Sequence, residues 1–366
     1  MFNISVAATI TLRYAAAMTI ELRRAYFRPL PCAPTRPNAR PLAGGLFGFA
    51  EVEVLRRGEA PEILPVDAAA AMHPEEAETI ALFSTRRPAL AGLDLTQPRI
   101  MGVVNVTPDS FSDGGQLIDA NDAVVHGLAL AAAGADILDI GGESTRPGAD
   151  PVGLDVELGR VIPVIEGLRA AGCPALISID TRKAAVAEAA LAAGAMMFND
   201  VSALTYDQRS LAVAATAPSV CLMHALADPR TMQDDPRYSD VLLDVYDFLE
   251  LRLAAAEAAG IDRARVVIDP GIGFGKTIEH NLALIRRLSL FHGLGCAVML
   301  GASRKRFIGS LSGVGEARKR VHGSVAAGLA GLAQGAQILR VHDVAETRQA
   351  MQVWRAIAGE QQAIGA

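Results

Sequence analysis

The chain has 366 residues, of which 51% are hydrophobic and 20% charged, and a formal net charge of -6. It can therefore bury a large core, and its charge argues against nucleic acid or an anionic membrane surface as the main partner. No run reaches the ~18 apolar residues of a membrane span. The four cysteines lack zinc or redox spacing, so we expect a cytoplasmic location.

Residues 1–97 form a front section without a recognisable catalytic constellation. The proline-rich range 27–41 predicts extended or irregular chain. Alternating apolar and polar residues over 47–55 predict a half-buried strand, and the alanine- and glutamate-rich range 68–83 predicts a helix. We interpret residues 1–97 as an N-terminal extension of unassigned role, with packing as the simplest one, and residues 98–366 as the main domain.

From residue 99 onward, apolar segments alternate with alanine- and leucine-rich stretches of helical spacing. Eight strands are expected, at residues 100–105, 136–141, 176–180, 196–200, 220–224, 266–269, 297–301 and 338–342. Several intervening helices end in glycine, a common C-terminal stop, at Gly134, Gly172, Gly194, Gly260 and Gly335. Eight βα units of this length predict an α/β fold, a (β/α)8 TIM barrel. A doubly wound open sheet is the alternative, but GxGxxG is absent.

Polar side chains stand at the carboxyl end of nearly every expected strand, where such barrels carry their catalytic residues. The set comprises Asn105, Asp139, Asp180, Asn199, Asp200, His224, Asp269, Ser303, Lys305, Arg340 and His342. Because buried polar groups cost free energy unless they are paired, their convergence indicates a ligand. For any single member, a capping or supporting role is as plausible as direct contact.

These side chains fall into two chemical subsets. Donors that suit an anion stand at the first strand and the last two, where barrels often bind phosphate: Asn105, Arg340, His342 and the Ser303-Arg304 turn. Arg340 and His342 share one strand face, which favours a common ligand over a core histidine. Asp180, Asn199, Asp269 and Lys305 form the second subset, which could pair with a flat heterocycle, because one carboxylate can take two N–H donors.

Seven segments, taken in order, resemble the motifs of the dihydropteroate synthases. They read NVTPDSFSDGG at 105–115, DIGGESTRPGA at 139–149, IDT at 179–181, FNDV at 198–201, DPGIGFGKT at 269–277, GASRKRFIG at 301–309 and RVHDV at 340–344. The resemblance implies a transferase of folate biosynthesis and a sulfonamide target. It would join 6-hydroxymethyl-7,8-dihydropterin pyrophosphate to p-aminobenzoate, with Mg2+ as cofactor and a homodimer as its assembly.

The same resemblance implies a role for each matching side chain. Asp139, Asp180, Asn199, Asp269 and Lys305 would bind the pterin, whereas Asn105, Arg340 and His342 would meet the pyrophosphate, with Mg2+ near Asn105. The p-aminobenzoate would lie among Phe111, Thr145, Arg146, Pro147, Phe274 and Ser303. The catalytic set would be Asn105, Asp113, Arg146, Lys305, Arg340 and His342.

Two departures from the family pattern lie near the expected p-aminobenzoate site. Residues 225–227 read ALA where many members have MQG, and Arg306 replaces a serine. Affinity for p-aminobenzoate is therefore the least transferable implication. A pterin-binding methyltransferase domain and a non-catalytic pterin-binding paralogue are the alternatives.

Overall fold

The computed structural model describes residues 25–107, 120–144, 150–226, 232–233 and 235–358. Its centre is a closed barrel of parallel strands in the order β10-β11-β12-β5-β6-β7-β8-β9. The strands are β5 (Arg99–Asn105), β6 (Ile137–Gly141), β7 (Leu176–Asp180), β8 (Met197–Asp200), β9 (Ser219–Met223), β10 (Val266–Asp269), β11 (Ala297–Leu300) and β12 (Ile338–Val341). This closed barrel confirms the predicted (β/α)8 TIM barrel. Each strand also ends within about one residue of its expected position.

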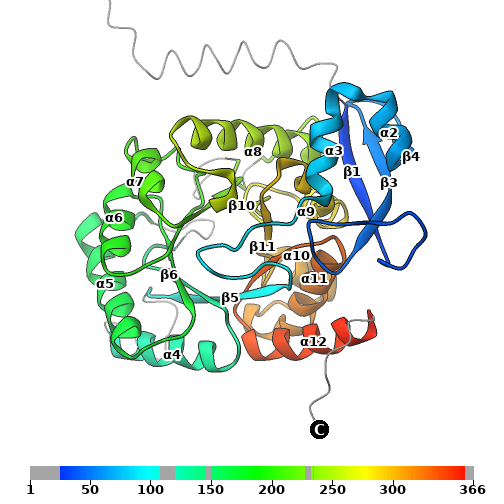
Figure 1. Ribbon diagram of the computed structural model, residues 1–366. Coiled ribbons are helices and arrows are strands. Elements are labelled where there is room, and N and C mark those ends of the chain that lie inside the picture. The colour runs from blue at the N-terminus through cyan, green and yellow to red at the C-terminus, as the bar shows by residue number, and fades with distance from the viewer. Residues whose placement is uncertain (1–24, 108–119, 145–149, 227–231, 234, 359–366) are drawn as a thin grey trace, which may run out of the picture.

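Helices surround this barrel (Figure 1). They are α4 (Ala120–Ala132), α5 (Leu154–Ala170), α6 (Ala184–Ala192), α7 (Ser210–Thr216), α8 (Val241–Ala258), α9 (Ile278–Arg286), α10 (Arg306–Ser312), α11 (Val321–Ala333) and α12 (Val344–Ile357). Short 3-10 turns are η3 (Arg263–Arg265), η4 (Leu288–Leu294) and η5 (Ala317–Lys319). The predicted glycine stops are confirmed at α4 and α6, where Gly134 and Gly194 have φ of +103° and +109°.

A leucine-rich turn closes the amino-terminal end of the barrel. Leu90 and Leu93 pair through their backbones, with N···O distances of 2.9 and 2.8 Å, across a turn in which Gly92 has a φ of +89°. Leu90 and Leu95 pack against residues in the first halves of the strands, among them Met101 and Val267. The carboxyl ends of the strands are therefore left as the end of the barrel that can hold a site.

The extension folds into a small antiparallel sheet with helices beside it. It comprises β1 (Tyr26–Cys32), β2 (Arg40–Pro41), β3 (Gly48–Leu55), β4 (Glu62–Pro65), α2 (Val66–Met72), η1 (Pro74–Glu76) and α3 (Ala77–Ser84). The predicted strand over 47–55 is confirmed by β3, and of the extended or irregular chain predicted over 27–41, the extended part is found in β1. Its prolines are tolerated because β1 is an edge strand paired only with β3. The helix expected over 68–83 is divided at Pro74.

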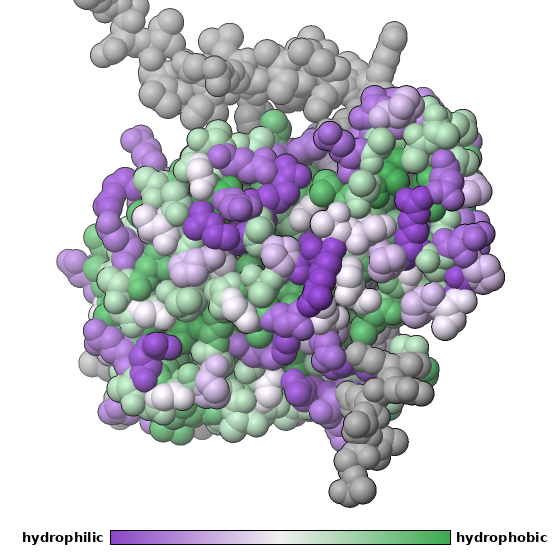
Figure 2. Space-filling view, in the orientation of Figure 1, coloured by the Kyte–Doolittle hydropathy of each residue, from purple (hydrophilic) through white to green (hydrophobic). Residues whose placement is uncertain are grey.

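The extension lies against one side of the barrel (Figure 1), and polar contacts fasten it there. Tyr26 Oη donates to Asp247 of α8 at 2.9 Å. The buried Arg87 guanidinium donates to the carbonyl oxygens of His292 and Cys296, each at 2.9 Å, just before β11 begins. Figure 2 shows polar and apolar side chains interspersed over this face of the barrel and over the extension. The two parts thus form one packed body.

Candidate functional site

A buried acidic cluster, made up of Asp139, Asp180, Asn199, Asp269 and Arg340, lies toward the carboxyl ends of β6, β7, β8, β10 and β12. Arg340 donates from Nε to Asp139 Oδ2 at 2.6 Å and from a terminal nitrogen to Asp180 Oδ2 at 2.7 Å. Asn199 Nδ2 donates to the same Asp139 oxygen at 3.0 Å. Asp139 Oδ1 is buried and has no hydrogen-bond partner among the residues that the structure describes. A buried acceptor of this kind calls for a donor from a ligand.

Burial disfavours the ionised form of two carboxyl groups here, those of Asp180 and Asp269. It raises the pKa of Asp180 to about 7, although Arg340 opposes the rise and Asp139 adds to it. Burial also raises the pKa of Asp269, against a hydrogen bond of 2.7 Å from Gly271 N to its Oδ1. Carboxyl groups in such surroundings gain most from a ligand that presents several N–H donors.

In the structure, the hydrogen-bond partners of Arg340 are two carboxylates, which the sequence analysis does not predict. The sequence analysis groups Arg340 with the anion donors, whereas in the structure its guanidinium pairs with the carboxylates of Asp139 and Asp180. Arg304, in the predicted Ser303-Arg304 anion turn, instead pairs with Asp343, with Nε to Oδ2 at 3.0 Å. Neither pairing could be read from the sequence, because each joins strand ends that are distant in the chain.

His342 and Ser303 meet between the ends of β11 and β12. Ser303 Oγ lies 3.1 Å from His342 Nδ1 and accepts from His342 N at 3.2 Å. Asn105 lies at the end of β5, and a Cβ added to Gly141 would come within 3.7 Å of its Oδ1 and of Asp180 Oδ2. The absence of a side chain at Gly141 therefore leaves space between Asn105 and the acidic cluster.

Lys305 and Phe274, which the sequence assigned to different substrates, are in direct contact. The Lys305 Nζ lies 3.9 Å from the centroid of the Phe274 ring. Gly273 has a φ of +83°, and a Cβ there would stand 3.0 Å from Lys305 Cδ. Glycine at this turn thus permits both the backbone conformation and the passage of the lysine side chain.

The sequence prediction missed one buried pair close to Phe274. Lys276 Nζ lies 2.8 Å from His224 Nδ1 and donates to the Phe274 carbonyl oxygen at 3.0 Å. Burial lowers the pKa of Lys276 to about 7 and that of His224 well below its usual value. Lys276 stands inside the DPGIGFGKT segment, so the motif held the signal although no role had been assigned to this lysine.

Several predicted site residues lie outside the described part of the chain, namely Phe111, Asp113, Thr145, Arg146 and Pro147. Within the described ranges, no group of three or more His, Cys, Asp or Glu residues could hold a metal ion. Mg2+ commonly uses only one or two protein oxygens together with water and phosphate, and the Asn105 amide oxygen is compatible with that mode. Among the helices described, none is long and apolar enough to cross a membrane.

Comparisons with known proteins agree with this geometry. The family model described as pterin binding enzyme matches residues 101–342. The dihydropteroate synthase of Neisseria meningitidis is 48% identical over 271 residues, covering 72% of this chain and 94% of the relative. That of Escherichia coli is 46% identical over 261 residues, covering 71% and 92%.

Solved structures are similar over the same region. The Xanthomonas albilineans dihydropteroate synthase with 4-aminobenzoic acid has a TM-score of 0.69 and 50% identity, covering 74% of this chain and 97% of that one. Its complex with 7,8-dihydropteroate has a TM-score of 0.66 and 48% identity, with the same coverage. A Yersinia pestis synthase with a sulfonamide drug has a TM-score of 0.69 and 44% identity, covering 72% of this chain and 96% of that one.

Proposed function

The chain belongs to the dihydropteroate synthase family of pterin-binding enzymes, and from this premise we propose how its residues share the reaction. It joins 6-hydroxymethyl-7,8-dihydropterin pyrophosphate to p-aminobenzoate and yields 7,8-dihydropteroate and pyrophosphate. The observation that carries the proposed roles is the buried cluster at Asp139, whose Oδ1 has no partner in the described part of the chain. Solved relatives with 4-aminobenzoic acid and with 7,8-dihydropteroate support the same substrates here.

The acidic cluster binds the pterin ring. Its aminopyrimidinone edge presents adjacent N–H donors, which suit the carboxylates of Asp139, Asp180 and Asp269. Asn199 is held against Asp139 at 3.0 Å and contributes an amide with both donor and acceptor capacity. Lys305, whose Nζ lies over the Phe274 ring, borders the pterin ring.

The leaving pyrophosphate lies toward Asn105 and His342. Arg340 links the two halves of the site, because its two hydrogen bonds to carboxylates leave further N–H groups of the guanidinium for an anion. Bound Mg2+, held by the Asn105 amide oxygen, would supply positive charge that stabilises the departing pyrophosphate. These donors lower the energy of the transition state by stabilising the charge that develops there.

The substitution is dissociative, and no covalent intermediate with the enzyme forms. The electron-rich dihydropterin spreads positive charge from its methylene as pyrophosphate leaves. The arylamine is a weak nucleophile, so its position matters more than a strong base. Phe274 and Ser303 would line the described part of its pocket, and the family resemblance assigns Phe111, Thr145, Arg146 and Pro147 to the same substrate.

The assembly and location are proposed as a homodimer in the cytoplasm. Support comes from the acidic composition, from cysteines that are all free among the described residues, and from the habit of the family. Light scattering of the purified chain tests the dimer, because a mass near the monomer value of 38.3 kDa would contradict it.

Turnover of purified protein tests the proposed function. With both substrates and Mg2+, we expect one pyrophosphate for each dihydropteroate formed, and no arylamine adduct when p-aminobenzoate is omitted. A pterin-binding methyltransferase would release no pyrophosphate. A non-catalytic paralogue would bind pterin without forming product, so either result contradicts the proposal.

A further inference from the structure

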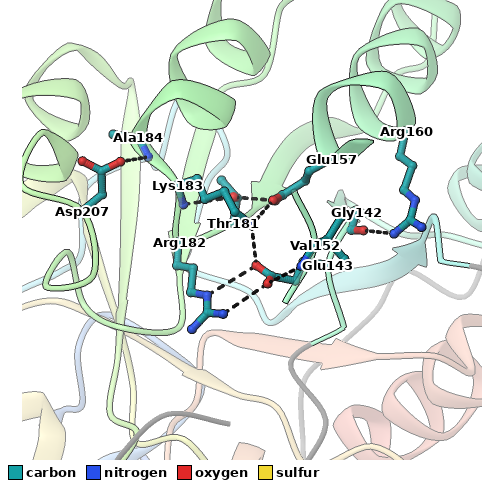
Figure 3. Close-up of polar contacts among 10 residues, drawn as sticks. All are labelled: Gly142, Glu143, Val152, Glu157, Arg160, Thr181, Arg182, Lys183, Ala184 and Asp207. Atoms are coloured by element: carbon teal, nitrogen blue, oxygen red, sulfur yellow. Dashed lines mark hydrogen bonds and ion pairs between the residues drawn. The ribbon is translucent and has the colours of Figure 1, made fainter. Parts of the chain in front are cut away.

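A second buried charge cluster lies beside the proposed site and has no part in the roles assigned above (Figure 3). It joins the connection between β6 and α5 to the connection between β7 and α6. Its members are Glu143, Glu157, Thr181, Arg182 and Lys183, of which Glu143, Glu157, Thr181 and Arg182 are buried. Two carboxylates face two cationic side chains, so the cluster is close to neutral.

Glu143 is the centre of this cluster. Its carboxylate accepts from Arg182, with Nε to Oε2 at 3.3 Å and a terminal nitrogen to Oε1 at 3.1 Å. Lys183 Nζ donates to Glu143 Oε2 at 2.8 Å and to Glu157 Oε2 at 2.5 Å. Burial raises the pKa of Glu143, but the hydrogen bonds from Arg182 and Lys183 outweigh it and leave the pKa lower than usual. Glu143 is therefore ionised and held by cations.

The same carboxylate also joins the two described ends of the β6–α5 connection. Glu143 stands two residues after β6, and its Oε1 accepts from Val152 N at 3.1 Å, just before α5 begins. Gly142 is fixed alongside: its carbonyl oxygen accepts from Arg160 at 2.8 Å, and a Cβ there would come within 2.7 Å of Val161 Cγ1. The Glu143 carboxylate thus joins the described residues on either side of 145–149.

The cationic partners of Glu143, Arg182 and Lys183, come just after Asp180 and Thr181 in the chain. Thr181 Oγ1 donates to Glu157 Oε1 at 2.6 Å, and its oxygen accepts from Lys183 N at 3.2 Å. Arg182 also lies over the Tyr206 ring, with its Cζ 4.2 Å from the centroid. These contacts therefore connect the start of the β6–α5 connection to the end of β7, which carries the proposed pterin-binding carboxylate of Asp180.

We propose that Glu143 is a positioning residue that sets the affinity for the arylamine substrate by fixing both ends of the β6–α5 connection. The inference rests on the proposed function, which places Thr145, Arg146 and Pro147, between those ends, at p-aminobenzoate. Buried ion pairs contribute little net stability compared with apolar packing. The effect that we assign to this cluster is instead to fix the positions of the chain segments that it joins. A shift of about 1 Å in a substrate-positioning group can cost on the order of a hundredfold in rate.

Glu143→Gln tests the proposal, because it keeps the size of the side chain but sets an NH2 group against cationic donors. We expect the KM for p-aminobenzoate to rise about tenfold or more, and the KM for the pterin pyrophosphate to change by less than about twofold. Glu143→Asp keeps the charge and should give a smaller rise. Lys183→Gln, which leaves Glu143 in place, should raise the same KM and serves as a second variant if Glu143→Gln does not fold.

Asp207→Ala is the matched control. Asp207 lies in the same region and accepts from Ala184 N at 3.1 Å, but no hydrogen bond joins it to Glu143. Its loss should leave the KM for p-aminobenzoate unchanged. Equal changes in both KM values for Glu143→Gln and Lys183→Gln, or no change in either, would overturn the inference alone. A wild-type chain that releases no pyrophosphate would overturn the proposed function and this inference with it.

Discussion

At the scale of single residues, the site depends on pairings between strand ends that are far apart in the chain. The identity of the polar residues could be predicted, because most apolar strands carry a polar or acidic residue at or near their carboxyl ends, such as Asn105 or Asp269. Their partners could not. The choice of Arg340 for Asp139 and Asp180 depends on how the barrel closes, which brings residues about 200 positions apart into contact.

Removal of the Arg340 guanidinium should affect both stability and pterin binding. Arg340→Met would leave Asp139 and Asp180 as buried carboxylates without their cation, at a cost of about 3–5 kcal/mol in the free energy of unfolding. Adding Asp180→Asn should restore part of that loss, because it removes one of the uncompensated charges. Denaturant unfolding of the single and double variants provides the measurement. Strictly additive losses would show that the two side chains do not interact.

The buried Lys276 should make stability depend on pH in the alkaline range. Its pKa is about 7 in the folded chain against 10.5 when exposed, so the unfolded chain binds more protons between these values. The free energy of unfolding should therefore rise with pH from about 7 to 10.5, and the full destabilising effect applies below 7. From pH 7 to 9, the rise should be at most about 2–3 kcal/mol.

Lys276→Met removes this titration, so the unfolding free energy of the variant minus that of the wild type should fall as pH rises from 7 to 9. Comparing the two proteins at each pH cancels the titration of groups that do not interact with Lys276. A difference that stays constant from pH 7 to 9 would mean that Lys276 has an ordinary pKa in the folded chain.

At the scale of elements, prediction worked where one structural signal dominated. The barrel strands are short apolar runs that end at polar residues, and several helices end at glycine, so their limits follow from local chemistry. In the extension, proline affected the prediction differently in two segments. Over 27–41 it left extended and irregular chain as alternatives, and the structure has β1 there, an edge strand in which a missing N–H costs little. It also divided the expected helix at Pro74, where the ring cannot continue the preceding turn.

Arg87 should be the main polar link between the extension and the barrel. Its guanidinium is buried and donates to four carbonyl oxygens, those of Leu82, Thr85, His292 and Cys296. Arg87→Met should lower the free energy of unfolding by about 2–4 kcal/mol, because it leaves buried acceptors unpaired. Arg86→Met is the control, since Arg86 is exposed and its loss should cost less than about 0.5 kcal/mol. Equal effects of the two changes would show that the buried contacts do not stabilise the chain.

At the scale of the whole molecule, the extension lies away from the catalytic end. It packs on η4 and α8, whereas the proposed site lies at the carboxyl ends of the strands. The solved relatives match about three quarters of this chain and nearly all of their own length, so their barrels fold without an equivalent of the whole extension. Here the extension packs against η4, in which Phe291 and His292 are fully buried.

Deletion of residues 1–84 should lower the thermal stability of the chain and leave its activity unchanged. We expect the thermal midpoint to fall by about 5 °C or more, because the covered surface of η4 becomes exposed. The KM values should stay close to those of the full chain, since the proposed site keeps all its residues. Calorimetry and the pyrophosphate assay measure the two effects. A truncated chain of unchanged midpoint would show that the extension has no stabilising role.

Calorimetric titration of a pterin without phosphates tests most directly the claim that the acidic cluster holds the heterocycle. One pterin should bind per wild-type chain. Asp269→Asn and Asn199→Ala should each weaken that affinity about tenfold or more, because a buried hydrogen-bonding partner of the ligand is lost. Unfolding curves like those of the wild type would show that both variants keep their fold. Pterin affinity unchanged in both variants would contradict the assignment of this cluster to the pterin.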